Sequence, residues 1–217
     1  MVAYGSVWYS FLSILRLMEN MRPKSRPQLD RDAWIAEAIE VLAAEGVAGL
    51  RVEVLAKRLG VTKGSFYWHF KDRQDLLDEA LTVWKEGRIR DIVKQTSVPP
   101  GQEAQQILHL IEVYSASRSR KGMLIELAVR DWAKRDAAVA AVVSEVDACR
   151  FKCARDLFLK CGLTVREASS RSLLLYAYVF GQSLMVVDQF DQSIDTLKSD
   201  IMEMIAGDAN RNVVSQD

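Results

Sequence analysis

The chain has 217 residues, of which 49% are hydrophobic and 27% charged, and only 4 are proline. This is the composition of a globular protein, with enough chain for one or two domains and a buried core. The 29 basic and 29 acidic residues cancel, which excludes any argument from total charge for nucleic-acid binding. The 3 cysteines, an odd number in a chain with no recognisable export signal, predict a reduced, cytoplasmic protein.

The N-terminal extension, residues 1–21, contains an apolar and aromatic run over 7–17. That run is shorter than the roughly 20 residues that span a bilayer, and it lacks the basic start of a signal peptide. We expect translation to begin at Met18 or Met21; an interfacial helix and an extra helix packed on the body are open alternatives. Residues 22–28 form a basic arm that could reach phosphates or could be a disordered tail.

Apolar residues at helical spacing predict four helices in the next part of the chain. Asp30 or Asp32 can cap the first helix, and Gly46 can end it. The four helices are expected at 31–45, 52–59, 63–69 and 72–95.

The second and third of these helices are joined by a short turn. Gly60 can end one helix in the left-handed conformation, and Thr62 can cap the next through its side-chain oxygen. The third helix is too short to be stable alone, so packing must hold it, and Phe66 and Phe70 are the expected anchors. Two helices joined by a short turn with glycine form the helix-turn-helix pattern, whose second helix lies in the major groove of DNA.

The Pro-Pro-Gly stretch at 99–101 is the clearest break in the chain. Only helical patterns follow it, with Gly162 as a stop and Thr164 with Glu167 as a capping box. Five further helices are expected at 102–117, 119–133, 136–160, 164–188 and 193–206. With no strand signal, the chain is predicted to be all-α with about nine helices.

Residues 59–77 carry a family resemblance. They read Leu-Gly-Val-Thr-Lys-Gly-Ser-Phe-Tyr-Trp-His-Phe followed by Lys-Asp-Arg-Gln-Asp-Leu-Leu. This stretch resembles the DNA-binding domain of TetR-family (TetR/AcrR-type) transcriptional regulators, and the resemblance is specific over residues 29–90. It implies a three-helix DNA-binding head over 29–90 and a helical body for ligand binding and dimerisation over 91–210.

The resemblance also implies which residues contact DNA. Between residues 46 and 73 there are six basic and two acidic residues, a local charge that suits phosphate contact or merely a solvated helix face. Lys63 can donate to guanine, whereas Tyr67 and His69 would fix the register on phosphates. The predicted DNA-contacting set is Arg51, Thr62, Lys63, Gly64, Ser65, Tyr67, Trp68, His69 and Lys71.

Two features of that set have alternative explanations. Tyr67, Trp68 and His69 could be core aromatics instead, although a helix-turn-helix needs an exposed second helix. Arg51 stands where the family usually has a capping serine or threonine, so either the cap is lost or Arg51 binds a phosphate.

The segment 173–187 is apolar nearly all round and must be buried on more than one side. The resemblance implies a homodimer in which the last two helices of each copy form a four-helix bundle; a central helix in a monomeric bundle is the alternative. Two heads one DNA turn apart would read a palindrome. The predicted dimer-interface residues are Leu174, Tyr178, Gly181, Met185, Leu197 and Ile201.

A ligand pocket in the body is a further implication of the resemblance. Aromatic and methionine side chains suit such a pocket, but at helical spacing they are more often core. The candidates are Trp84, His109, Tyr114, Trp132, Phe151, Tyr176, Tyr178 and Met185. Cys149 and Cys153 could share a metal or sense oxidants, but they lie on an apolar stripe where cysteine acts as a small hydrophobe. We therefore expect no metal and no cofactor.

The resemblance implies a ligand-responsive repressor that binds an operator palindrome as a homodimer and releases it when a small molecule binds the body. An enzyme is poorly supported, since the chain has 2 histidines and no glycine-rich phosphate loop. The alternatives are a helical small-molecule-binding protein that has lost DNA binding, an enzyme in a helical bundle, and a membrane-associated regulator that uses residues 1–21.

Overall fold

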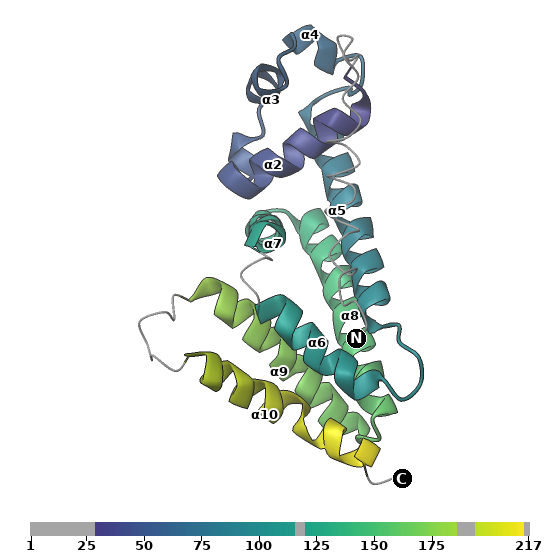
Figure 1. Ribbon diagram of the computed structural model, residues 1–217. Coiled ribbons are helices and arrows are strands. Elements are labelled where there is room, and N and C mark those ends of the chain that lie inside the picture. Colours follow the sequence, from purple (N-terminus) through teal and green to yellow (C-terminus); the bar gives the residue numbers. More distant parts are fainter. Residues whose placement is uncertain (1–28, 116–119, 186–193, 215–217) are drawn as a thin grey trace, which may run out of the picture. The chain divides into compact units, whose positions relative to one another are not determined.

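The computed structural model describes residues 29–115, 120–185 and 194–214. These residues form nine α-helices and no strand, which confirms the predicted all-α fold (Figure 1). The predictions for residues 1–28 lie outside the described part of the chain. The chain divides into two compact units, and each is described by itself.

The first unit contains the helix-turn-helix. Its helices are α2 (Arg31–Gly49), α3 (Val52–Leu59), α4 (Lys63–Phe66) and α5 (Arg73–Thr96), of which α5 continues into the second unit from Ile92. The unit also includes most of α7 (Arg120–Ala133), from Leu124, and the first turns of α8 (Ala137–Lys160), as far as Ser144.

Two of the predicted helix ends in this unit, at Asp30 and Gly60, are confirmed. The N–H of Ala33 donates to Asp30 Oδ1 at 2.9 Å, so Asp30 caps α2. Gly46 has a φ of 69° and breaks the helical path, although one more helical turn follows it to Gly49. Gly60 ends α3 with a φ of 69°, a left-handed conformation that glycine adopts at little cost.

Helix α4 has only 4 residues and is held by aromatic packing. Phe66 and Phe70 are buried, as predicted, and their rings stack at 5.2 Å between centroids. Trp34 of α2 meets Phe66 edge to face at 5.4 Å. The guanidinium of Arg31 lies 4.9 Å from the centre of the Phe70 ring. Such contacts replace the hydrogen-bond ladder that a single turn cannot supply.

The predicted helix 63–69 is shorter in the structure. After Phe66 the chain tightens, with hydrogen bonds from the N–H of Tyr67 to the carbonyl of Gly64 (3.3 Å) and from the N–H of His69 to that of Phe66 (2.9 Å). These bonds span three residues, the spacing of the narrower 3₁₀ turn. Phe66 and Phe70 remain in the core, whereas Tyr67 and Trp68 between them are exposed.

Arg73, at the start of α5, is tied to the junction between α2 and α3. Its Nε donates to the carbonyl of Leu50, and its Nη2 donates to the carbonyl of Val47 at 2.6 Å. Both oxygens belong to the end of α2, where helical carbonyls lack partners within the helix. One side chain therefore joins α5 to the first half of the helix-turn-helix.

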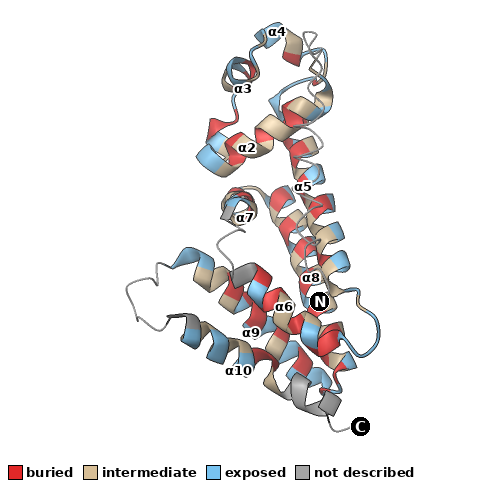
Figure 2. Cartoon of the chain, viewed as in Figure 1, coloured by how far each residue is buried: buried red, intermediate tan, exposed pale blue. Residues whose placement is uncertain are grey.

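The second unit contains α6 (Glu103–Ser115), the rest of α8, α9 (Val165–Leu184) and α10 (Ile194–Val214). Gly101, with a φ of 88°, turns the chain after the Pro-Pro pair, as predicted. Helix α10 continues about two turns beyond its expected end at residue 206, where apolar periodicity stops. The core of this unit includes Ile107, Ile111, Leu157, Phe158, Leu175, Tyr176, Val179 and Ile205 (Figure 2).

Thr164 and Glu167 form the predicted capping box at the start of α9. The N–H of Glu167 donates to Thr164 Oγ1 at 3.3 Å, and the N–H of Thr164 donates to Glu167 Oε2 at 3.0 Å. The hydroxyl of Thr164 also donates to Glu167 Oε2 at 2.6 Å, and these hydrogen bonds hold the pKa of Glu167 below its usual value.

We expect Thr164→Ala to lower the free energy of unfolding by about 1 kcal/mol, because the first turn of α9 loses its side-chain cap. Urea unfolding followed by circular dichroism measures the loss. Thr62→Ala is the matched control: Thr62 also occupies an N-cap position, but its side chain makes no capping hydrogen bond. Equal losses in the two variants would contradict the capping role of Thr164.

Candidate nucleic-acid interface

The aromatic residues after α4 divide between the core and the surface. Phe66 and Phe70 are buried, whereas the exposed fraction is 54% for Tyr67 and 87% for Trp68. His69 is half-buried, with its ring 6.5 Å from that of Phe70. Tyr67 and Trp68 are therefore not core aromatics, and their exposure is what a DNA-contacting helix requires.

The other predicted DNA-contacting residues also lie at the surface of the first unit. Ser65 is half-buried, and the exposed ones are Arg51, Thr62, Lys63, Gly64 and Lys71. A tryptophan exposed to this extent is unusual for a folded protein without a partner. Contact of this surface with DNA stays a prediction, which the exposure permits.

Two helix starts near this surface lack side-chain caps. Arg51 is the N-cap of α3 and makes no side-chain capping hydrogen bond, so the cap is lost there. Thr62 is the N-cap of α4, but the expected bond from its side-chain oxygen is absent, and that prediction was wrong. Instead the carbonyl of Thr62 accepts from the N–H of Ser65 at 3.0 Å. Both Arg51 and Thr62 are exposed.

Two of the basic residues of this region have structural partners. Arg58 pairs with Glu37, and its Nη1 lies 3.6 Å from Glu45 Oε1. Arg73 donates to the two backbone carbonyls described above. The positive charge that remains for phosphates is therefore smaller than the sequence count suggests.

Glu53 is a residue of this surface that sequence reasoning missed. Its carboxylate on α3 forms an ion pair with Lys63 Nζ at the start of α4. The hydrogen bond from Lys63 holds the pKa of Glu53 below its usual value, and the same bond raises the pKa of Lys63. The two residues are ten positions apart on different helices, so no helical periodicity joins them.

Helix α9 of the second unit exposes large apolar side chains (Figure 2). Among the predicted dimer residues, the exposed fraction is 49% for Leu174 and 68% for Met185. The other four are half-buried: Tyr178, Gly181, Leu197 and Ile201. Sequence reasoning did not single out Leu173, Leu184 and Met204, which are also exposed.

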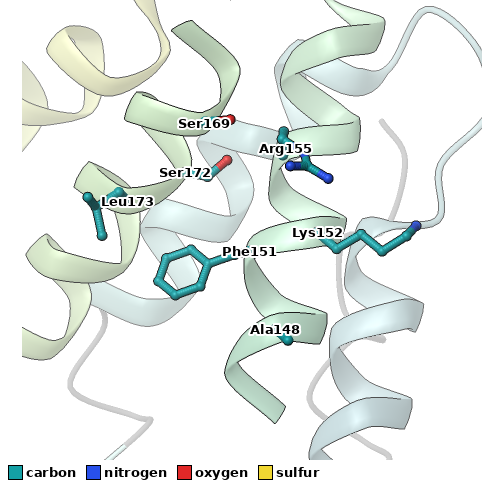
Figure 3. Close-up of a pocket in the computed structure, with 7 residues that line it drawn as sticks. All are labelled: Ala148, Phe151, Lys152, Arg155, Ser169, Ser172 and Leu173. Carbon is teal, nitrogen blue, oxygen red and sulfur yellow. The ribbon is translucent and has the colours of Figure 1, made fainter. Parts of the chain in front are cut away.

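A pocket of about 310 Å³ lies between α8 and α9 in the second unit (Figure 3). Figure 3 shows the ring of Phe151 directed toward α9, where Leu173 lies. The ring also meets Tyr176 edge to face at 5.5 Å. The pocket is lined by Ala148, Phe151, Lys152, Arg155, Ser169, Ser172 and Leu173.

Of the predicted pocket residues, the structure places only Phe151 at this pocket. Met185 is exposed, and the side chain of Tyr114 lies outside the described residues. His109 and Tyr178 are half-buried, and the remaining three are buried: Trp84, Trp132 and Tyr176. Sequence reasoning did not single out the polar lining residues, of which Lys152 and Ser169 are exposed, Arg155 is half-buried and Ser172 is buried.

The cysteines are poor candidates for metal or redox chemistry. Cys149 Sγ and Cys153 Sγ lie 4.0 Å apart on α8, and both residues are half-buried. Burial is the main cause that raises the pKa of Cys149, and burial raises that of Cys161 to about 11. Such thiols stay protonated at neutral pH, whereas metal ligands and nucleophiles are thiolates.

Among the described residues, no three histidine, cysteine or acidic side chains gather as a possible metal site. None of the helices described is long and apolar enough to cross a bilayer.

The fold and the exposed turn of α4 define a class: an all-helical protein with a helix-turn-helix of the DNA-binding type. Comparison with known proteins agrees. Residues 35–80 match the model of the bacterial regulatory proteins of the tetR family. Residues 35–80, which contain the helix-turn-helix, therefore form a DNA-binding domain of the TetR family of transcriptional regulators.

The curated relatives match only part of the chain. The HTH-type transcriptional regulator AcrR of Shigella flexneri is 27% identical over 113 residues, which cover 49% of this chain and 51% of the relative. The tetracycline repressor protein class C of Escherichia coli is 47% identical over 51 residues, 24% of this chain and 23% of the relative. The match thus spans about half of the first relative's length and a smaller part of the second's.

Solved structures resemble more of the chain, and at these identities they show the fold. A transcriptional regulator from Rhodococcus sp. Rha1 has a TM-score of 0.59 at 17% identity, covering 86% of this chain and 97% of that one. The regulator FadR of Bacillus subtilis, in complex with stearoyl-CoA, has a TM-score of 0.56 at 17% identity, over 80% and 96%. A candidate regulator from Saccharomonospora viridis, in complex with choline, has a TM-score of 0.64 at 16% identity, over 81% and 94%.

Proposed function

We propose that this protein is a sequence-specific DNA-binding regulator, a ligand-responsive repressor that holds a palindromic operator as a homodimer. The observation that carries the proposal is the arrangement of α4, whose Phe66 is sealed in the core while Tyr67 and Trp68 face solvent. A short helix that packs on the core with one side and is exposed to solvent on the other is suited to enter a major groove. Binding to operator DNA would occur in the cytoplasm, without a membrane.

The homodimer is proposed from the apolar face of α9. Leu174 and Met185 expose carbon surface that a single chain leaves in water, and between them Gly181 has no atom within 4 Å of the position a Cβ would take. A partner helix can approach closely over such a residue. Two copies joined there could present two α4 helices about 34–36 Å apart, the spacing of operator half-sites.

The effector is proposed to be an amphipathic small molecule bound by the body. Phe151 and Leu173 offer apolar surface in the pocket between α8 and α9, and Lys152 and Arg155 bring positive charge to the same pocket. Related structures hold choline or stearoyl-CoA, which illustrates how different the ligands of this fold can be. To release DNA, the effector must bind the DNA-free state more tightly than the DNA-bound state.

The proposal is tested by fluorescence anisotropy with the intergenic DNA upstream of the gene, over a series of salt concentrations. Specific binding should exceed binding to scrambled DNA of the same length by at least about 10³-fold and should weaken steeply with salt. If scrambled and intergenic DNA bind equally, or neither binds, the head does not read sequence, and the protein is a small-molecule-binding protein of the same fold.

We expect Lys63→Ala to weaken operator binding roughly 5- to 150-fold and to relax the preference at one base position, because Lys63 lies at the start of the reading helix. Lys71→Ala should weaken binding to all sequences alike and reduce the salt slope by about 1, as expected for a phosphate contact. Competition binding with single-position operator variants separates the two patterns. A uniform loss for Lys63→Ala would mean that Lys63 contacts only phosphate.

A further inference from the structure

Glu53 and Lys63 form an exposed ion pair at the surface that is proposed to face DNA. The exposed fraction of the side chain is 62% for Glu53 and 53% for Lys63. Glu53 is the second residue of α3 and Lys63 the first of α4, so the pair bridges the two helices of the helix-turn-helix. The carboxylate of Glu53 also accepts a hydrogen bond from its own backbone N–H.

A carboxylate at this place needs an explanation. DNA carries one negative charge per about 1.7 Å of helix axis, so an unpaired Glu53 would be repelled by the duplex. The ion pair neutralises that charge locally, and the bond between the two groups lowers the pKa of Glu53 and raises that of Lys63. The surface that meets the groove therefore presents a hydrogen-bond acceptor directly beside a donor.

The major-groove edge of a G·C base pair has the complementary order. Guanine N7 and O6 accept, and cytosine N4 donates beside them, since O6 and N4 are joined by a Watson–Crick hydrogen bond of about 2.9 Å. We propose that the Glu53–Lys63 pair reads one G·C base pair in each operator half-site, with Lys63 donating to guanine O6 and N7 and Glu53 accepting from cytosine N4. This inference rests on the proposed DNA-binding function.

The other base pairs fit the same donor and acceptor less well. C·G and A·T reverse the order of the central groups and would place Lys63 against an amino group. T·A keeps the order, but it offers Lys63 one acceptor next to a methyl group and places adenine N7, an acceptor, beside the carboxylate of Glu53. The pair thus discriminates both the base pair and its orientation.

The test is selection of binding sites from a random DNA library, followed by sequencing, with the full-length wild-type protein and Glu53→Gln. The substitution keeps the shape of the side chain but removes its charge and adds a donor; glutamine pairs best with adenine. We expect enrichment of G·C to fall roughly tenfold at one position of each half-site and to stay unchanged at the other positions. At that position, adenine should become more frequent in place of the cytosine that Glu53 contacts. Binding to non-specific DNA should become tighter, because one negative charge is gone.

Glu86→Gln is the matched control, since Glu86 is an exposed glutamate on α5 of the same unit and its substitution changes the charge by the same amount. It should leave every base preference intact. Circular dichroism melts of both variants should match the wild type, because both residues are exposed. Lys63→Ala should relax preference at the same base pair as Glu53→Gln.

Three results separate the outcomes. If Glu53→Gln keeps the wild-type base preference at every position, the inference is overturned. It is also overturned if Glu53→Gln and Lys63→Ala lose base preference at different base pairs. A wild-type protein that enriches no palindrome overturns the proposed function, and with it the inference; this failure is recognised because it appears before any substitution is made.

Discussion

Replacing Phe66 with alanine is expected to cost about 3–5 kcal/mol of the free energy of unfolding and to abolish DNA binding. Phe66 is fully buried and packs on Trp34 and Phe70, with ring centroids at 5.4 Å and 5.2 Å. Helix α4 has only 4 residues, so no internal ladder remains to hold it when this ring is removed. Differential scanning calorimetry of the full chain and anisotropy with operator DNA measure the two losses.

Trp68→Ala is the control for this prediction. Trp68 follows Phe66 by two residues, and its exposed fraction is 87%. The substitution Trp68→Ala removes an even larger ring than Phe66→Ala does. We expect stability to change by no more than about 0.5 kcal/mol, while operator affinity falls. If Phe66→Ala proved as mild as Trp68→Ala, α4 would have to be held by something other than aromatic packing.

The second large effect is expected for Leu174→Glu on α9. Leu174 is half-exposed in the single chain, so a charge there should leave the fold intact. In a homodimer packed through this face, the glutamate would be buried without a partner, a change that removes stable association. Sedimentation velocity should show a monomer at concentrations where the wild type is a dimer, and operator affinity should fall at least about 100-fold because only one head can bind at a time.

Val165→Glu is the matched control on the same helix. Val165 is 64% exposed and lies nine residues before Leu174, about two and a half turns away, which places it on the opposite side of α9. It is also the first residue of the helix, where a negative charge is favourable. The variant should remain a dimer. A wild type that sediments as a monomer, or a Leu174→Glu protein that sediments as a dimer, would exclude this face as the interface.

Much of the fold could be predicted because helix positions follow from local patterns. The apolar spacing over 52–59 and the glycine after it predicted the bounds that α3 has in the structure. Thr164 with Glu167 predicted the start of α9. The errors lie where tertiary packing overrides local preference. Helix α4 is shorter than expected, because the chain tightens after Phe66, although Phe66 and Phe70 remain stacked in the core.

The candidate site was predictable where a motif carried it and not elsewhere. The exposure of Tyr67 and Trp68 follows from the helix-turn-helix pattern, which requires an outward-facing second helix. The partnership of Glu53 with Lys63 could not be foreseen, since it depends on how α3 and α4 meet in space. The pocket residues around Phe151 escaped notice for the same reason, since the pocket depends on how α8 and α9 pack against each other.

The hydrogen bonds of Arg73 have a mechanical consequence. Helix α5 is continuous from Arg73 to Thr96, and Arg73 grips the carbonyls of Val47 and Leu50 with two separate nitrogens. Two hydrogen bonds from one side chain to these carbonyls restrict both rotation and separation of α5 relative to the end of α2. A tilt of α5 within the first unit would therefore be passed to the end of α2 through these two hydrogen bonds.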